Sequence, residues 1–256
     1  MLISQKISAV IITYNEIGYI EKCLDSILFA DEIIVIDSYS TDGTFEYLKS
    51  NARIKTLQKP FENYTLQKSF ALEQASHDWV LFIDADEIVT ENLKKEIVQT
   101  VHNPTEHVAF WFYRQFMFQK EKLRYSGWQT DKNHRLFRKS KVKFTEKKLV
   151  HEALEVNGSS GVFQEKLLHY CYKNYTDYKG KMLRYGRLKA KEAFLRKEKF
   201  SYGALLLKPA WKFVYHYFLR LGILDGKKGI IICYLNAMSD LEKYRELKKL
   251  EATSSS

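Results

Sequence analysis

Three carboxylates, Asp84, Asp86 and Glu87, stand within four positions at the end of the apolar run WVLFIDADEIVT. Each neighbouring anion raises the free energy of the next, so this cluster requires a compensating cation. Mg²⁺ and Mn²⁺ bind a few carboxylate oxygens and complete their coordination with water and phosphate oxygens. The cluster therefore predicts a Mg²⁺ or Mn²⁺ site at the end of a strand. The alternative is that Asp84 and Glu87 belong to the first turn of a following helix, which favours acidic residues.

The elements that position this cluster follow from the apolar pattern of the first 90 residues. Runs rich in β-branched residues predict four buried strands, at 7–15, 31–40, 53–58 and 78–87. Helical spacing or capping residues predict helices between them, at 17–28, from about 41, and at 65–76. Such alternation is typical of right-handed βαβ units, so we expect an α/β fold with a mostly parallel sheet and flanking helices.

Polar residues follow three of these strands, in the segments 13–16, 37–40 and 84–87. Ligands of open parallel sheets bind outside the carboxyl ends of the strands, so these segments are expected to meet in one crevice. No GxGxxG follows the first strand and no GxxxxGK[ST] occurs in the sequence. Both absences argue against a dinucleotide-binding or P-loop phosphate site.

The alternation ends near residue 105, and the remainder predicts two further sheet segments, in HVAFWFYRQFMF and HRLFRKSKVKF, and then helices. A basic helix is expected at 175–198. The segment 202–238 is rich in aliphatic and aromatic residues, but Lys208, Lys212 and Arg220 interrupt it. It therefore predicts an amphipathic segment at a membrane surface rather than a spanning helix, with a core helix pair and solvated lysines as the alternative. We expect a catalytic domain at 1–170 and a basic C-terminal region at 171–256.

Charge is concentrated in that C-terminal region. Residues 1–170 hold 22 Lys and Arg against 23 Asp and Glu (net −1), and residues 171–256 hold 19 against 8 (net +11). A basic region of this kind suits the anionic cytoplasmic leaflet of a membrane or a nucleic acid. Its aromatic residues lie in apolar surroundings and form no known recognition helix or zinc finger, so no nucleic-acid partner is expected.

The predicted compartment is the cytoplasm, at the inner face of the cytoplasmic membrane. Cys23, Cys171 and Cys233 are odd in number and widely spaced, which argues against a disulfide framework. The first residues, MLISQKISAVIITYNE, make a poor signal peptide and a good first strand.

The segments VIITYNE, EIIVIDSYSTDGT and WVLFIDADE, in this order, resemble the nucleotide-sugar-binding half of the inverting glycosyltransferases of family 2, which have the GT-A fold. RLFRK, VHE and LLLKPAWKFVYHYFLRLGILDGKKG are similar to the branch that includes bacterial lipopolysaccharide-core β-glucosyltransferases. The resemblance covers about residues 7–238. It implies metal-dependent transfer of a hexose, with glucose expected, from a nucleotide sugar such as a UDP-sugar to a glycan or glycolipid acceptor such as lipopolysaccharide core.

The family pattern implies roles for individual residues. Asp37 is expected to hydrogen-bond the base or ribose, Asp84 to face the ribose, and Asp86 to bind the metal. Lys68 is expected to reach the ribose or diphosphate, although a solvated lysine on a helix is equally consistent with the sequence. The remaining residues expected to line the nucleotide-sugar pocket are Thr13, Asn15, Glu16, Ser40, Asp42 and Ala85.

An inverting transfer also requires a base that takes the proton of the acceptor hydroxyl. Glu152 matches the position of that base after the strand RLFRK, and Asp131 is the second candidate. His151 replaces the usual first acid and is expected to be a metal or diphosphate ligand, or else a loop residue. Arg135 and Arg138 are expected to meet phosphates or the acceptor, with a solvent-facing position as the alternative.

Two other functions are compatible with parts of the pattern. A nucleotidyltransferase of similar fold would also bind a nucleotide and a metal at strand ends, but TYNEIGYIEK has an acid where a Gly-rich basic loop is expected. A nucleic-acid-binding protein is suggested only by the net charge of +10.

Overall fold

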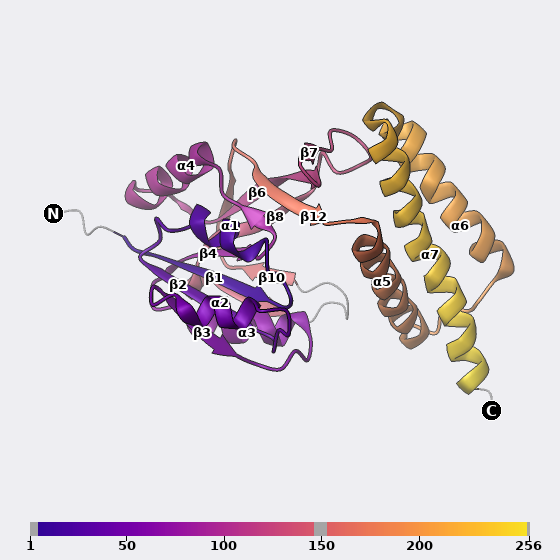
Figure 1. The fold of residues 1–256 in the computed structure, drawn as a ribbon, viewed down its shortest axis with the longest axis horizontal. Helices are drawn as coiled ribbons and strands as arrows, with labels where there is room; N and C mark the ends of the chain where they lie inside the picture. The colour runs from indigo at the N-terminus through magenta and orange to yellow at the C-terminus, as the bar shows by residue number, and fades with distance from the viewer. Residues whose placement is uncertain (1–4, 146–152, 255–256) are drawn as a thin grey trace. The chain divides into compact units, whose positions relative to one another are not determined.

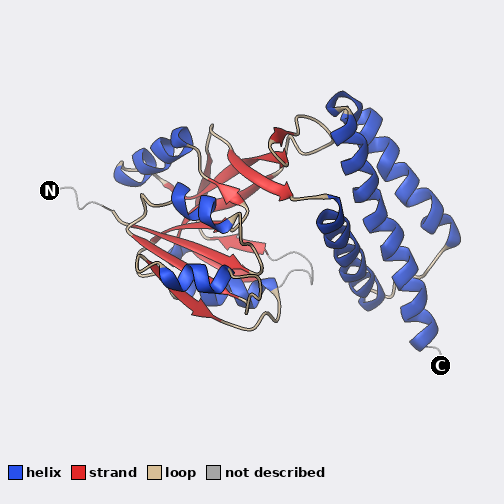
Figure 2. Ribbon diagram, viewed as in Figure 1, coloured by secondary structure: helices blue, strands red, loops and turns tan. Residues whose placement is uncertain are grey.

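The computed structural model describes residues 5–145 and 153–254, and Figures 1 and 2 show its ribbon. The described residues form two compact units. The first holds residues 5–114, 131–145 and 153–169, and the second holds 115–130 and 170–254. The predicted division of roles, a catalytic domain at 1–170 and a basic C-terminal region at 171–256, stays a prediction.

The alternation predicted for the first 90 residues is confirmed. Strands β1 (Ile7–Thr13), β2 (Glu32–Asp37), β3 (Ile54–Gln58) and β4 (Trp79–Asp84) pair in parallel in the order β3-β2-β1-β4. Helices α1 (Ile20–Ser26), α2 (Thr44–Ser50) and α3 (Tyr64–Glu73) connect them. Figure 2 shows these helices against the strands of the first unit.

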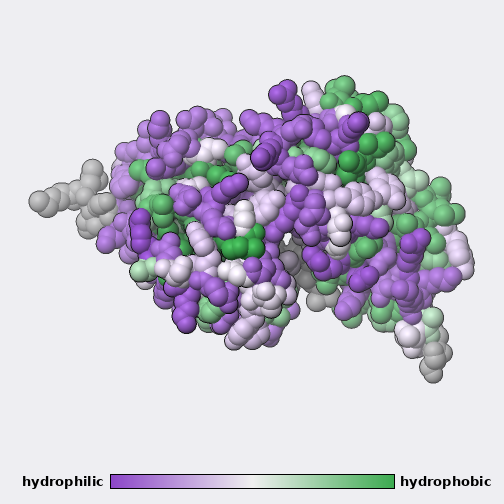
Figure 3. Space-filling model, in the orientation of Figure 1, coloured by the Kyte–Doolittle hydropathy of each residue, from purple (hydrophilic) through white to green (hydrophobic). Residues whose placement is uncertain are grey.

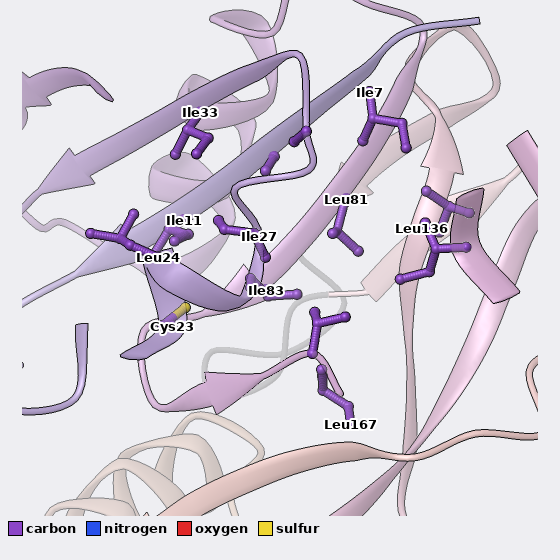
Figure 4. Packing of buried hydrophobic residues seen from close by; sticks show 14 of the residues in the cluster. Ile7, Ile11, Cys23, Leu24, Ile27, Ile33, Leu81, Ile83, Leu136 and Leu167 are labelled. Atoms are coloured by element: carbon purple, nitrogen blue, oxygen red, sulfur yellow. The ribbon is translucent and has the colours of Figure 1, made fainter. Parts of the chain in front are cut away.

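Strands β1, β2 and β4 are buried on both faces because their side chains alternate between two apolar clusters, whereas β3, at the end of the strand order, has exposed residues. Ile11 of β1 packs with Leu24 and Leu81 in one cluster, part of which Figure 4 shows, whereas Val10 packs with Phe82 in the other. Buried apolar residues on both sides explain the near-continuous apolar runs in the sequence.

Beyond β4 the sheet continues with strands of mixed direction. They follow β5 (Glu87–Ile88) and α4 (Glu91–His102), and they are β6 (His107–Phe118), β8 (Lys132–Arg138) and β12 (Leu167–Tyr172). Among the described residues the order is β4-β8-β6-β12-β5, with β11 (Ser159–Val162) beside β6. A 3₁₀ turn, η1 (Lys139–Lys141), leads to a separate pair, β9 (Val142–Thr145) with β10 (Ala153–Val156).

The direction of β8 decides which of its residues reach the carboxyl end of β4. The two strands are antiparallel, with Trp79 opposite Arg138 and Leu81 opposite Leu136. Residues earlier in β8 therefore lie nearer the end of β4. Arg135 is accordingly brought to the acidic cluster, and Arg138 to the opposite end of the strand.

The second unit is mainly helical. It contains β7 (Glu121–Lys122), which pairs with the end of β6, and helices α5 (Tyr175–Leu195), α6 (Tyr202–Val214) and α7 (Lys227–Ser254). A π-helical turn, η2 (Tyr215–Leu219), and a 3₁₀ turn, η3 (Gly222–Asp225), lie between α6 and α7. None of the helices in the described part of the chain is long and apolar enough to cross a membrane.

A buried aspartate joins distant parts of this unit. Asp225 is 7% exposed and accepts hydrogen bonds from the backbone N–H groups of Arg124 and Tyr125, each at 2.9 Å. The hydroxyl of Ser126 donates to the same carboxylate at 3.1 Å. Asp225 therefore holds residues 124–126 in place, although about a hundred residues separate them in the sequence.

Candidate active site

The carboxyl ends of β1, β2 and β4 meet at one edge of the sheet, as predicted. Thr13 pairs in register with Asp37, and Ile12 pairs with Asp84. Neighbouring strands are about 4.8 Å apart, so these polar ends lie side by side. The hydroxyl oxygen of Thr13 is buried and has no hydrogen-bond partner among the described residues. A buried polar atom of this kind at the edge of a site is suited to bind a ligand.

Asp37 is fully buried and braces the loop that follows β2. Its carboxylate accepts from the backbone N–H of Ser40 at 3.0 Å, from the Ser40 hydroxyl at 2.5 Å and from Gln58 Nε2 at 3.1 Å. These contacts hold the carboxylate in place, and its predicted contact with a base or ribose stays a prediction.

The loops after β1 and β2 are joined by hydrogen bonds. Asn15 has a φ of 55°, its backbone N–H donates to Ser40 Oγ at 2.9 Å, and its side-chain oxygen accepts from Thr41 at 2.8 Å. The N–H of Glu16 donates to Thr44 Oγ1 at 3.0 Å. The predicted pocket residues Asn15, Glu16 and Ser40 thus belong to one preformed edge.

Asp42 supports the same edge. It accepts from the backbone N–H of Ile17 at 3.1 Å and from the hydroxyl of Thr44 at 2.6 Å. Burial raises the pKa of Asp42, but these hydrogen bonds outweigh burial and hold the pKa below its usual value. Asp42 is therefore ionised and holds the two loops together, and its predicted place in the pocket wall stays a prediction.

A buried ion pair stands at the end of β4. Arg135 of β8, 4% exposed, contacts both carboxylate oxygens of Asp84, whose side chain is 32% exposed. Burial raises the pKa of Asp84, but the positive charges of Arg135 and Lys68 outweigh burial and bring the pKa well below its usual value. The alternative that Arg135 faces solvent is wrong, because this guanidinium is buried against the acidic cluster. Its predicted contact with a phosphate or the acceptor stays a prediction.

Glu87 corrects a second expectation. It does not begin a helix, because α4 starts at Glu91 with Thr90 as its cap. Glu87 instead lies in β5 and is fully buried, where it accepts from the backbone N–H of Asp84 at 2.9 Å and from Arg135 at 2.6 Å. Glu87 is therefore part of the charged cluster, and it turns the chain back after Asp84.

Arg114 of β6 extends this network. Its Nη1 lies 3.6 Å from Glu87, and its Nε donates to Asp131 at 2.6 Å. Burial lowers the pKa of Arg114, but Glu87 and Asp131 outweigh burial and raise it. Carboxylates and guanidiniums therefore alternate from Asp84 to Asp131. Most of the repulsion among the acids is thus relieved by arginines of the chain itself.

Asp86 lies apart from these arginine contacts and close to a histidine. Its Oδ2 is 3.2 Å from Nε2 of His169 on β12, and the two side chains are 13% and 9% exposed. His169 is brought there because it pairs in register with Glu87 across β12 and β5. Ala85, 4% exposed, separates Asp84 from Asp86 and packs into the core. Asp84 is thus held by an arginine, whereas Asp86 lies beside an imidazole.

Two further groups face the acidic cluster. Lys68 of α3 is 8% exposed, with its Nζ 5.7 Å from the centre of the Phe82 ring, so the alternative of a solvated helix residue is wrong. Cys23 Sγ lies 3.5 Å from the carbonyl oxygen of Asp84. Burial, together with the charges of Glu87 and Asp86, raises the pKa of the Cys23 thiol well above its ordinary value. Cys23 therefore stays protonated.

Arg138 does not reach the site. Its guanidinium lies 4.4 Å from the Trp79 ring centre and pairs with Asp78 at 3.3 Å, before the start of β4. The predicted phosphate or acceptor contact of Arg138 is therefore wrong for this edge, because β8 runs antiparallel to β4. Glu152 and His151 lie outside the described residues, so their predicted roles stay predictions.

Sequence reasoning missed Arg114 and His169, and it did not foresee that Glu87 is buried. His169 could have been noticed in the sequence. In LLHYCY it lies on the same strand face as the buried Leu167, where an apolar residue is expected. Arg114 and Glu87 left no such signal, because their burial depends on pairings with distant strands.

Comparison with known proteins gives the family. Residues 8–158, more than half of the chain, match the family described as Glycosyl transferase family 2. The chain belongs to this family. It is 28% identical over 255 residues to the "Lipopolysaccharide core biosynthesis glycosyltransferase LpsC" of Rhizobium meliloti, with 93% of each chain covered. It is also 28% identical over 261 residues to an uncharacterized glycosyltransferase of Rickettsia typhi, covering 98% of this chain and 89% of that protein.

The fold agrees with the family. A "Mannosyltransferase PcManGT from Pyrobaculum calidifontis in complex with GDP-Man and Mn2+" superposes with a TM-score of 0.54 at 11% identity, over 95% of this chain and 87% of that one. The chain has the GT-A fold, as the sequence resemblance implied. Membership of family 2 makes this protein a glycosyltransferase enzyme, in place of the nucleotidyltransferase and nucleic-acid-binding alternatives.

Proposed function

We propose that this family 2 enzyme is a metal-dependent inverting hexosyltransferase. It moves a hexose, with glucose the first to test, from a nucleotide sugar to a glycan or glycolipid acceptor. The observation that carries the proposal is the separation of the two aspartates, with Asp84 held by Arg135 and Asp86 beside His169. In this proposal Asp84 faces the nucleotide, and Asp86 together with His169 offers ligands to a cation.

The nucleotide end of the donor would lie against the loops after β1 and β2. Thr13, Asn15 and Asp37 line this edge and are held by the hydrogen bonds between the two loops. Lys68 supplies positive charge near Asp84, where the ribose and diphosphate would lie. The sequence resemblance to lipopolysaccharide-core glucosyltransferases supports UDP-glucose as the first donor. The mannosyltransferase of similar fold, which binds GDP-Man and Mn²⁺, supports GDP-mannose as the second donor to test.

The residues present fit a divalent cation. Asp86 and His169 offer a carboxylate oxygen and an imidazole nitrogen 3.2 Å apart, which are ligands suited to Mn²⁺. The described residues contain no cluster of three or more His, Cys, Asp or Glu side chains suited to a metal. Water and the diphosphate would therefore supply the other ligands. When bound, the cation would stabilise the negative charge that builds on the departing diphosphate. His151 stays a second candidate for this place.

The chain must also supply the base. We retain Glu152 as the group that takes the proton from the acceptor hydroxyl as that oxygen attacks the anomeric carbon. Asp131 is the second candidate, but its carboxylate is engaged by Arg114 at 2.6 Å. That contact favours a role in holding Arg114 and Glu87 over one in proton transfer.

The acceptor is proposed from the named relative. Because LpsC is named for lipopolysaccharide core biosynthesis, we propose a lipopolysaccharide-core glycolipid as the acceptor class. Such an acceptor is anchored in a membrane, and nucleotide sugars are cytoplasmic, so we place the enzyme at the inner face of the cytoplasmic membrane.

The test combines donor turnover with ligand stabilisation. Release of nucleoside diphosphate from UDP-, GDP- and dTDP-sugars is measured with Mg²⁺ or Mn²⁺, and thermal unfolding is followed with each nucleoside diphosphate. We expect stabilisation by one of them that requires Mn²⁺ and is lost in Asp86→Asn. Asp78→Asn is the matched control, because Asp78 lies at the other end of β4. Failure of every donor to react with either metal would overturn the proposal.

A further inference from the structure

The second unit exposes a continuous apolar surface on α6 and the turns after it. We call it the α6 surface. Leu207 is 71% exposed, Trp211 60% and Leu219 61%. The other members are Leu206, Val214, Tyr215, Phe218, Leu221, Ile223 and Leu224, all at least 37% exposed. Figure 3 shows apolar residues gathered over α6 and the turn that follows it.

The helix α6 is apolar on its exposed face, and its half-buried residues, such as Leu205 and Phe213, are mostly apolar as well. Within Tyr202–Val214, all of which the structure describes, no residue is buried. The polar contacts point to α7, where Lys212 Nζ lies 3.0 Å from Asp240 and 3.2 Å from Ser239. Leu207, Trp211 and Val214 share the other face at helical spacing. A surface helix normally turns its apolar stripe to the core, so α6 requires an apolar environment that its own unit does not supply.

The charges within the segment that carries this surface are almost all positive, although Glu121 of β7, 71% exposed, pairs with Lys228 at 2.7 Å. Residues 201–234, all of them described, contain a single acid, Asp225, and it is buried against backbone N–H groups. Lys208 and Lys227 are exposed on the same segment. The α6 surface is therefore apolar and aromatic, with exposed lysines and no exposed carboxylate. This composition matches helices that lie in the interface of an anionic membrane, where Trp and Tyr rings are favoured.

We propose that the α6 surface docks on an anionic lipid bilayer, with its leucines and Trp211 in the headgroup region and its lysines against the lipid phosphates. A second copy of the chain fits less well. A two-fold interface would place the same surface against itself, so Lys208 and Lys227 would meet like charges without a carboxylate from residues 201–234 to pair them. This proposal is independent of the donor and acceptor proposed above.

The experiment is co-sedimentation of the full chain with vesicles. One set contains equal amounts of phosphatidylglycerol and phosphatidylcholine, and the other contains phosphatidylcholine alone. We expect binding to the anionic vesicles, weaker binding to the neutral ones, and weakening by about 0.5 M salt. The double variant Leu207→Gln/Trp211→Gln should lower the partition coefficient about tenfold or more. Lys208→Glu and Lys227→Glu should each lower it about fivefold on anionic vesicles.

Matched controls separate this surface from general effects. Leu195→Gln changes an apolar residue of α5 that is 68% exposed and lies outside the α6 surface. Lys49→Glu reverses an exposed charge on α2 of the first unit. Both should bind vesicles like the unchanged protein. Because every substituted residue is exposed, thermal unfolding should shift little in all variants.

Two results would overturn the proposal. The first is that the unchanged protein stays in the supernatant with both kinds of vesicle. The second is that Leu207→Gln/Trp211→Gln binds as well as the unchanged protein. A concentration-dependent dimer that this double variant abolishes, without vesicle binding, would assign the surface to a second copy instead. Donor turnover in detergent-free buffer is measured in parallel, because it reports the proposed transferase activity and not docking.

Discussion

The two ends of β4 carry the same kind of ion pair in different surroundings. At the amino end Arg138 and Asp78 lie 3.3 Å apart, with side chains 25% and 42% exposed. At the carboxyl end Arg135 is 4% exposed and contacts Asp84 together with Glu87, which is fully buried. Both arginines come from β8, three positions apart. The same two residue types thus serve the surface of the fold at one end and a candidate active site at the other.

The two arginines differ because Arg135 is buried and contacts a second carboxylate, Glu87, whereas Arg138 does neither to the same extent. An exposed pair contributes about 0–1 kcal/mol, because water already solvates both charges. Breaking a buried pair costs about 3–5 kcal/mol, because the remaining charge is left without a partner. Arg135 contacts two carboxylates, so its loss leaves the fully buried Glu87 to Arg114, whose Nη1 is 3.6 Å away, and leaves Asp84 to the charge of Lys68. The charge balance at the carboxyl end of β4 therefore depends on Arg135.

The largest expected effect comes from removing one arginine at a time. Arg135→Met should lower the free energy of unfolding by about 3–5 kcal/mol near neutral pH, because the fully buried Glu87 and the partly exposed Asp84 both lose their nearest cation. Arg138→Met should cost about 1 kcal/mol or less, counting its stacking on Trp79. Urea unfolding measures both. Equal losses in the two variants would show that the two ends of β4 do not differ in this way.

A smaller effect is expected at His169. His169→Gln should weaken Mn²⁺ binding about 10- to 100-fold, because the imidazole beside Asp86 is lost. The matched control is His102→Gln, which changes an exposed histidine at the end of α4. Mn²⁺ titration in the presence of UDP, followed by thermal unfolding, gives the affinity. Unchanged affinity in His169→Gln would remove this residue from the proposed metal site.

The smallest expected effect is a difference in how far Asp84 and Asp78 make the free energy of unfolding depend on acid pH. The pKa values of Asp84 and Asp78 are both below the ordinary value of 3.8. Burial raises the pKa at both residues. At Asp84 the charge of Arg135 outweighs burial, whereas at Asp78 hydrogen bonds from Ser140 come before the charge of Arg138. A carboxylate with a depressed pKa stabilises the fold above its unfolded pKa, and the contribution is lost as the pH falls below that value.

Stability measured from pH 6 down to about pH 2 checks this sign. Asp84→Asn should flatten the acid limb of the curve more than Asp78→Asn, because the pKa of Asp84 is depressed further. The opposite order would mean that the exposed end of β4, not the buried one, carries the acid-sensitive charge.

The sequence predicts the parallel half of the fold well, because β1, β2 and β4 are almost continuous apolar runs and β3 follows from its place in the alternation of strands and helices. Thr13, Asp37 and Asp84 could be placed at one edge for the same reason. The other half is different. β5 has only two residues, and Glu87 is buried there by pairing with β12, about 80 residues later. Arg135 and Arg138 could not be told apart before the direction of β8 was known.

The structure of the C-terminal region was likewise predictable only in part. The helix expected at 175–198 and the amphipathic segment at 202–238 are present as α5 and as α6 with the start of α7. Helical periodicity predicted their existence. It did not show that Lys212 would turn inward to Asp240 while Leu207 and Trp211 face outward. That orientation depends on how α6 packs on α7, which no local pattern specifies.

The hydrogen bonds of Asp225 have a consequence for the order in which the chain folds during synthesis. Residues 124–126 emerge from the ribosome about a hundred residues before Asp225. At about 5–20 residues per second they wait roughly 5–20 s for their partner. Strands β1 to β4 need only residues already made. The first unit therefore acquires its candidate nucleotide edge early. In the second unit Phe116 and Leu123 pack with Ile232 and Leu235, so they are covered only when the last part of the chain has been made.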